Sequence, residues 1–189
     1  MTSRLILICH GSTAAIRESR FPLDEPLDVQ GEAGAAALAA RVPKADRCLS
    51  SPELRTRQTA EALGLAATIE AELRDCDFGA WRGRSLKDVH ASEPDAVATW
   101  LRDPAATPHG GESLLGVMKR VADWLCREQG RRGTSIVITH AAIVRAAILC
   151  ALGAPADSFW RIDIAPLSCS RLSSNGSRWS LSAGCSFLE

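Results

Sequence analysis

Two of the four histidines stand at the same kind of position, directly after an apolar segment. His10 follows the apolar run at residues 5–9, and His140 follows the run at residues 135–139. Arg55 lies in the segment "SSPELRTRQTA", just after a third short apolar stretch. A neutral imidazole is a nucleophile near pH 7, a protonated one adds positive charge, and arginine offers paired donors that fit phosphate. These side chains are suited to binding and attacking a phosphoryl group.

The elements that must position these side chains alternate between strands and helices. We predict buried strands at residues 4–9, 47–49 and 135–138, with a further extended segment at 66–73. Helices are expected at residues 31–42 and at 141–152. Another helix should run from a Ser50 or Ser51 cap to about residue 63, and another should begin near residue 113. Two short helices are expected between residues 85 and 102. Residues 12–28 are expected to be irregular, and the last thirty residues to form a short helix and two polar strands.

This alternation predicts an α/β fold, a three-layer α/β/α sandwich with a mostly parallel central sheet. In open α/β sheets, ligands bind beyond the carboxyl ends of the strands. We therefore expect His10, Arg55 and His140 to meet at that edge of the sheet. Helix N-termini that converge there would add N–H donors and a partial positive charge, which favours an anion.

Composition bounds the class of protein. The 189 residues are expected to form a single domain, 1–189, and the zero net charge gives no reason to expect nucleic acid or an anionic membrane as a partner. No apolar run is long enough to span a membrane, and residues 1–10 do not resemble a signal peptide. Seven cysteines without C-x-x-C spacing favour buried free thiols in a cytoplasmic protein. No metal or other cofactor is expected.

Five short motifs follow one another in an order that resembles the histidine phosphatase superfamily, also called phosphoglycerate mutase-like. They are H-G at residue 10, S-P-x-L-R-T-R-Q-T-A from residue 51, L-x-acid-x-D-F-G-x-W from residue 73, G-G-E-S from residue 110, and the histidine at residue 140. The resemblance implies that His10 is the nucleophile and forms a phosphohistidine. Arg55 and His140 would bind the phosphoryl oxygens, and Asp75 would be the general acid.

The resemblance also implies an activity and a set of substrate contacts. The expected activity is the metal-independent hydrolysis of a small phosphomonoester, with α-ribazole phosphate as the candidate substrate because "DFGAW" and "GAPADSFW" look closest to that branch. A homodimer is a candidate assembly. The residues expected near the substrate are Cys9, Gly11, Ser12, Arg17, Arg20, Glu112 and Ala141.

The chain departs from the family pattern at several of these positions. Cys9 stands where the family has an arginine that binds phosphate, Asp75 where glutamate is usual, and Ala141 and Ala142 where glycines are usual. Ser12 stands where glutamate is common. One hypothesis is that another arginine replaces the lost one, with Arg17, Arg20, Arg82 and Arg84 as candidates, and Glu112 is an alternative acid.

Two alternatives follow from these departures. The first is a catalytically impaired protein that binds a phosphorylated molecule on the same fold. The second is a cysteine nucleophile, but the C-x5-R spacing that such phosphatases need places Ala15, not arginine, after Cys9. The same spacing at Cys76 and at Cys126 is interpreted as coincidence.

Overall fold

A six-stranded sheet forms the centre of the protein in the computed structural model, which describes residues 2–182. The strands are β1 (Ser3–Cys9), β2 (Arg47–Ser50), β3 (Thr68–Ile69), β4 (Gly133–Thr139), β5 (Cys169–Ser174) and β6 (Trp179–Ser182), in the order β3-β2-β4-β1-β5-β6. Neighbouring strands from β3 to β1 pair in parallel, and β5 is antiparallel to both β1 and β6. The sheet is therefore mostly parallel, as expected.

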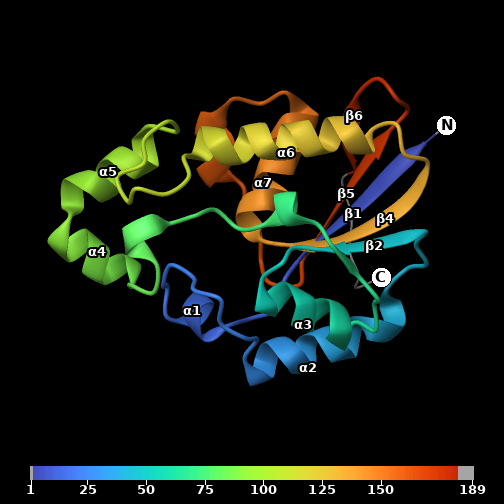
Figure 1. Ribbon diagram of the computed structural model, residues 1–189, viewed down its shortest axis with the longest axis horizontal. Helices are drawn as coiled ribbons and strands as arrows, with labels where there is room; N and C mark the ends of the chain where they lie inside the picture. Colours follow the sequence, from blue (N-terminus) through green and yellow to red (C-terminus); the bar gives the residue numbers. More distant parts are fainter. Residues whose placement is uncertain (1, 183–189) are drawn as a thin grey trace.

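Helices cover both faces of the sheet and confirm the three-layer sandwich (Figure 1). Leu5 and Leu7 of β1 belong to a buried cluster that includes α6 (Leu114–Glu128) and α7 (Ala141–Leu152). Ile6 and Ile8 point to the opposite face, where α2 (Val29–Leu38) and α3 (Leu54–Ala62) pack. The continuous apolar run in β1 follows from this arrangement, because a strand covered on both faces has no polar side.

A small helical cap lies beyond the sheet, at the end of the molecule opposite the N-terminus (Figure 1). It contains α4 (Leu86–Ser92) and α5 (Pro94–Arg102), and a separate buried cluster of Phe21, Trp81, Val89 and Val97 holds it together. The remaining short elements are α1 (Ala14–Arg17) and the 3-10 turns η1 (Ala39–Arg41), η2 (Ala71–Leu73), η3 (Gly79–Trp81) and η4 (Ala156–Arg161).

The start of α3 differs from the sequence-based expectation for a reason that matters to the site. The helix begins at Leu54, its N-cap is Glu53, and neither Ser50 nor Ser51 caps it. The Ser51 hydroxyl instead contacts His140, at 2.6 Å from Nε2. Ser51, in the segment before the helix, therefore contacts His140, the residue that follows β4.

Other differences are local. Residues 12–28 contain α1, because Thr13 caps it by accepting a hydrogen bond from the Ile16 amide. The extended segment at 66–73 is reduced to β3 and η2. No helix within residues 2–182 has both the length and the apolar character needed to cross a membrane.

Most cysteines that the structure describes agree with the expectation of free thiols. Cys9, Cys48, Cys76, Cys126 and Cys150 are free, but of these only Cys9 is buried: Cys48, Cys76 and Cys150 are half-buried, and Cys126 is exposed. Cys185 lies outside the described residues.

The loop that carries Asp75 is fixed by a close backbone approach. Gly79 has a φ of +46°, and a Cβ at this position would lie 2.1 Å from the carbonyl oxygen of His109. The amide of Ala80 donates to that same carbonyl at 2.8 Å, and the amide of Glu112 donates to the Asp77 carbonyl at 2.8 Å. Gly79, the glycine of the "DFGAW" motif, is therefore required for two reasons: a side chain would collide with the His109 carbonyl, and its positive φ favours glycine.

Candidate active site at the carboxyl ends of β1 and β4

His10 follows β1 directly and is held as a neutral imidazole. Its Nδ1 lies 2.8 Å from the carbonyl oxygen of Gly11. A carbonyl only accepts hydrogen bonds, so Nδ1 carries the hydrogen and Nε2 carries the lone pair. Burial, followed by the charges of His140 and Arg55, lowers the pKa of His10 to about 3. The side chain is thus an unprotonated nucleophile at neutral pH.

Arg55, in the first turn of α3, is a fully buried cation that connects three parts of the site. Its Nε donates to Nε2 of His10 at 3.3 Å, and its Nη1 donates to the Leu23 carbonyl at 2.9 Å. Its Nη2 donates to Oδ2 of Asp75 at 2.8 Å. The guanidinium is only 1% exposed, so its charge acts in a poorly hydrated environment where it is strongly felt.

His140 lies at the N-terminus of α7, with its ring centroid 5.2 Å from that of His10. Its Nε2 contacts Oγ of Ser51 at 2.6 Å and Oε2 of Glu53 at 3.0 Å. Its Nδ1 is buried and makes no hydrogen bond within the described chain, although Oδ2 of Asp75 lies 3.5 Å away. A buried ring nitrogen without a partner is costly, and a phosphoryl oxygen would satisfy it.

Glu53 is a functional residue that the motif contains but that the sequence analysis did not single out. Burial raises the pKa of Glu53, but the hydrogen bond and charge of His140, together with Ser51, outweigh it and hold that pKa well below its usual range. Its second oxygen, Oε1, accepts from the backbone amide of Asp75 at 3.0 Å. One ionised carboxylate therefore positions both the second histidine and the Asp75 loop.

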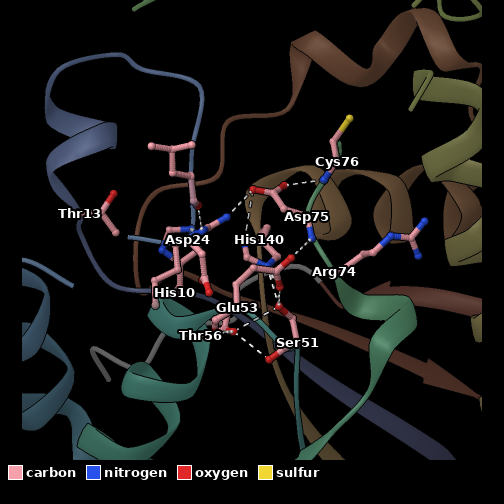
Figure 2. Close-up of polar contacts among 12 residues, drawn as sticks. His10, Thr13, Asp24, Ser51, Glu53, Thr56, Arg74, Asp75, Cys76 and His140 are labelled. Carbon is pink, nitrogen blue, oxygen red and sulfur yellow. Dashed lines mark hydrogen bonds and ion pairs between the residues drawn. The ribbon is translucent and has the colours of Figure 1, made fainter. Parts of the chain in front are cut away.

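Asp75 is ionised and faces Arg55 and His140 (Figure 2). Burial raises its pKa, yet the charges of His140, Arg55 and His10 together hold it below the usual value. Its Oδ1 accepts from the Cys76 amide at 2.9 Å, while Oδ2 is turned toward Arg55 and His140.

A cavity of about 280 Å³, here called the histidine cavity, opens between these groups. Seven of the residues predicted for the site line it: Cys9, His10, Arg20, Arg55, Asp75, His140 and Ala141. Further lining residues were not predicted as site residues: Ala15, Ile16, Pro22, Glu25, Phe78, Ala142, Arg145, Ile164 and Pro166. The strand-end histidines and the arginine of α3 thus meet where the topology predicts.

Three predicted substrate contacts do not line this cavity. The Gly11 amide donates to Oγ1 of Thr59 at 3.0 Å, and the Ser12 hydroxyl donates to Asp28 at 2.9 Å. Arg17 forms an ion pair with the same Asp28 at 2.9 Å. These residues contact other parts of the fold and do not line the histidine cavity, so their contact with substrate stays a prediction.

Glu112 is also outside the histidine cavity. Its carboxylate pairs with Arg120 at 2.7 Å and with Arg74 at 3.5 Å. Of the two carboxylates weighed as the acid, the structure places Asp75 beside the histidines and Glu112 in a separate ion-pair cluster. Glu25 is a second carboxylate on the cavity wall.

Cys9 is 2% exposed and contributes a neutral thiol rather than an anion or a donor pair. Burial, then the charge of Asp75, raises the pKa of Cys9 to about 12. A thiol that stays protonated is a poor nucleophile, which argues against cysteine chemistry at this position.

Arg145 of α7 lines the histidine cavity together with Cys9 and Arg20. Its Nε donates to the Ile162 carbonyl at 2.7 Å, and its guanidinium lies 5.5 Å from the ring centre of Phe159. Arg82 and Arg84 do not line this cavity. Arg145 lies five residues after His140 on the following helix, but this spacing alone does not show which side chains of the helix face the cavity.

No group of three or more His, Cys, Asp or Glu side chains in the described part of the chain is arranged to hold a metal ion. The site that the structure does build combines a neutral imidazole, the buried cation of Arg55, the half-buried cation of Arg145, an unpartnered ring nitrogen and a carboxylate. This set of groups suits nucleophilic attack on an anionic phosphoryl group.

The buried state of His10 predicts a specific loss of stability in acid. In the unfolded chain His10 takes up a proton below about pH 6.5, whereas the folded chain resists until about pH 3. The unfolded state therefore binds more protons between these values, and this side chain alone lowers the free energy of unfolding by about 1.4 kcal/mol for each pH unit below 6.5.

His10→Gln should remove this dependence, so that its stability falls less steeply than that of the wild type between pH 6.5 and pH 5. Urea unfolding at several pH values measures the effect, with His90→Gln as the control because His90 is exposed. Equal slopes for the wild type and His10→Gln would contradict the assignment of a neutral His10.

Comparison with known proteins supports one family. The sequence model of the histidine phosphatase superfamily (branch 1) matches residues 5–184. The "Bifunctional protein Rv2228c" of Mycobacterium tuberculosis is 32% identical in an alignment 188 residues long, which covers 92% of this chain and 51% of that protein. The chain thus spans about half the length of this relative.

Two other relatives match over most of their length. The glucosyl-3-phosphoglycerate phosphatase of Mycolicibacterium vanbaalenii is 31% identical over 173 residues, covering 82% of this chain and 77% of that protein. The adenosylcobalamin/alpha-ribazole phosphatase of Salmonella typhimurium is 28% identical over 174 residues, covering 85% of each.

A solved structure agrees with the sequence matches. The mycobacterial glucosyl-3-phosphoglycerate phosphatase in complex with VO3 superposes with a TM-score of 0.84 at 26% identity, covering 95% of this chain and 97% of that one. The match along residues 5–184, the shared fold and the strand-end histidines lead to one conclusion: this chain belongs to the histidine phosphatase superfamily.

Proposed function

We propose that this chain is a metal-independent phosphatase that hydrolyses a small phosphomonoester through a phosphohistidine on Nε2 of His10. The observation that carries the proposal is the lone pair on this nitrogen, which lies beside the buried guanidinium of Arg55 and close to the unpartnered Nδ1 of His140. The phosphatase names of several relatives support the reaction class.

The first half-reaction forms the bond between Nε2 of His10 and phosphorus, and breaks the bond between phosphorus and the alcohol oxygen. Asp75 gives its proton to that oxygen as the alcohol leaves. In the second half-reaction Asp75 takes a proton from water, whose oxygen attacks phosphorus. The phosphorus–nitrogen bond then breaks, which releases inorganic phosphate and neutral His10.

Substrate binding supplies the proton arrangement that Asp75 needs. In the free site its Oδ2 occupies the donor on Arg55 that a phosphoryl oxygen would use. When the phosphoryl group takes this donor and Nδ1 of His140, Asp75 loses its cationic partners and gains a neighbouring negative charge. Burial then dominates and raises the pKa of Asp75, so the carboxyl group becomes a proton donor once substrate is bound.

Arg145 supplies the positive charge that Cys9 cannot. It lies on the wall of the histidine cavity, and it comes from α7 rather than from the strand end where the family has its arginine. Phosphoryl transfer depends mainly on positioning and charge stabilisation, so a cation from another element can serve the same purpose.

The substrate is proposed to be α-ribazole phosphate, as the resemblance of the "DFGAW" and "GAPADSFW" segments implies. A relative named for that activity supports this choice, whereas another is named for glucosyl-3-phosphoglycerate.

A second candidate function is a binding protein with little turnover. The contact between Asp75 and Arg55 favours it, because this ion pair competes with phosphate for the same donor. The first two experiments below separate the two functions.

Replacing the nucleophile should abolish hydrolysis. His10→Ala is expected to lower kcat at least about a thousandfold while the protein stays folded, because no other group takes its place in the reaction. Release of inorganic phosphate from p-nitrophenyl phosphate measures this, with His90→Ala as the control and with EDTA present in a parallel series. Activity that survives His10→Ala, or that EDTA removes, would refute the mechanism. A wild type that binds phosphate without turnover would favour the binding protein.

Replacing the acid should matter most for poor leaving groups. Asp75→Asn is expected to slow hydrolysis of alkyl phosphates about a hundredfold or more, and that of p-nitrophenyl phosphate much less, because nitrophenolate leaves without a proton. The ratio of kcat/KM for the two esters measures the effect, and Glu112→Gln, which lies outside the histidine cavity, is the matched control. Equal losses on both esters would assign the acid role elsewhere.

Replacing Arg145 should weaken phosphate binding. Arg145→Met keeps much of the side-chain volume and is expected to raise the Kd for inorganic phosphate about tenfold or more, because charge-assisted hydrogen bonds are lost. Calorimetry on the wild type and on Arg17→Met, an arginine outside the cavity, provides the comparison and needs no turnover. An unchanged Kd for Arg145→Met would remove it from the phosphate site.

A further inference from the structure

We propose that the alcohol portion of the substrate is an apolar, ring-bearing group, held in a second cavity that adjoins the histidine cavity. The proposal rests on the proposed function, and it adds the class of leaving group that the site accepts.

The second cavity, here called the aromatic pocket, has a volume of about 240 Å³ and is enclosed mainly by apolar side chains. Its aromatic members are Phe21, Phe78, Trp100, Phe159 and Trp160. They come from different parts of the chain: Trp100 belongs to α5 of the cap, and Trp160 to the turn η4 that follows α7. The cap and the sandwich therefore build the pocket together.

The two cavities are neighbours. Arg20, Pro22, Phe78, Ala142 and Arg145 line both of them. A substrate whose phosphoryl group is held near His10 therefore has the aromatic pocket beside it, within reach of its alcohol portion. The two arginines stand at the boundary, where they face the anionic part of a substrate and leave the apolar walls for the remainder.

The aromatic pocket presents apolar surface that remains open to water. The rings of Trp100 and Trp160 pack edge to face, with centroids 4.7 Å apart and an interplanar angle of 64°. Trp160 nevertheless remains 39% exposed and Leu86, also on the pocket wall, 41%. A flat apolar group placed against this exposed surface would remove it from water, which is favourable in proportion to the area covered.

Polar alcohols fit this pocket poorly. Cys76 is the thiol on its wall, and burial, then the charges of Asp75 and Glu112, raises the pKa of that thiol, so it brings no negative charge. The hydroxyl groups of a sugar or the carboxylate of an acid would lose water if they entered this pocket and would find few partners, which is costly. The pocket therefore favours an alcohol that carries a ring, as α-ribazole does, over an alcohol that ends in a bare sugar or a carboxylate.

Two esters with the same type of leaving oxygen test the preference. Both 2-(1-naphthyl)ethyl phosphate and ethyl phosphate release a primary alcohol, so chemistry alone does not separate them. The wild type is expected to show a kcat/KM at least about tenfold higher for the naphthyl ester. Equal values, or a higher value for glycerol phosphate, would overturn the proposal.

Variants connect the preference to the pocket. Trp100→Ala should lower kcat/KM for the naphthyl ester about tenfold and leave that for ethyl phosphate nearly unchanged, whereas Leu101→Ala, on the same helix but not on the pocket wall, should change neither. Because Trp100 also packs in the cap, Leu86→Glu provides a second variant at a half-exposed wall position, and it should give the same selective loss. A preference that survives Leu86→Glu in a folded protein would contradict the proposal.

Binding to His10→Ala separates this proposal from the proposed function. Calorimetry should show that the inactive protein binds the naphthyl ester at least about tenfold more tightly than ethyl phosphate, even if the wild type hydrolyses neither. Tight binding of the naphthyl ester without hydrolysis by the wild type would refute the proposed mechanism and support the pocket assignment. Hydrolysis of both esters without preference would support the mechanism and refute the pocket assignment. A wild type that sediments as a dimer while Leu86→Glu is a monomer would show that a second copy covers the pocket, which refutes the proposal.

Discussion

The buried guanidinium of Arg55 is the group on which the rest of the site depends. A charge removed from water must be compensated by its neighbours, and here His10, the Leu23 carbonyl and Asp75 do so. These partners come from the end of β1, from the segment before α2 and from the loop after η2. One side chain of α3 therefore sets the relative positions of three segments, and it also presents the charge that an incoming phosphoryl group meets.

In the proposed mechanism, the ion pair between Asp75 and Arg55 links the binding of substrate to the protonation of Asp75. The ion pair in the free site satisfies Arg55 and helps to keep Asp75 ionised. Glu53 contributes to this arrangement because its two oxygens contact His140 and the Asp75 amide separately. In the proposed mechanism Glu53 stays ionised and fixes the geometry, and Asp75 changes its partners when substrate binds.

The sequence predicts the layers and the meeting of His10, Arg55 and His140, because strand ends and apolar runs are local features with a fixed consequence in a parallel sheet. It does not predict Arg145, since only the packing of α7 decides which of its side chains faces the cavity. Nor does it predict the ion pair between Glu112 and Arg120, which lies eight residues further along on α6. The direction of a side chain on a helix depends on how the helix packs, and pattern and spacing in the sequence do not predict it.

The backbone contacts at Gly79 hold together the two ends of the segment that forms the cap. Ala80 binds the His109 carbonyl and Glu112 binds the Asp77 carbonyl, so the chain leaves and re-enters the body of the protein at one closed point. The segment between these two contacts, which includes α4, α5 and Trp100, therefore begins and ends at the same place in the fold. Trp100 and Leu86 thus reach the proposed alcohol pocket from a segment that begins and ends beside the Asp75 loop but does not contain Asp75. A change in the length of this segment would alter one wall of that pocket and leave both of its anchoring hydrogen bonds in place.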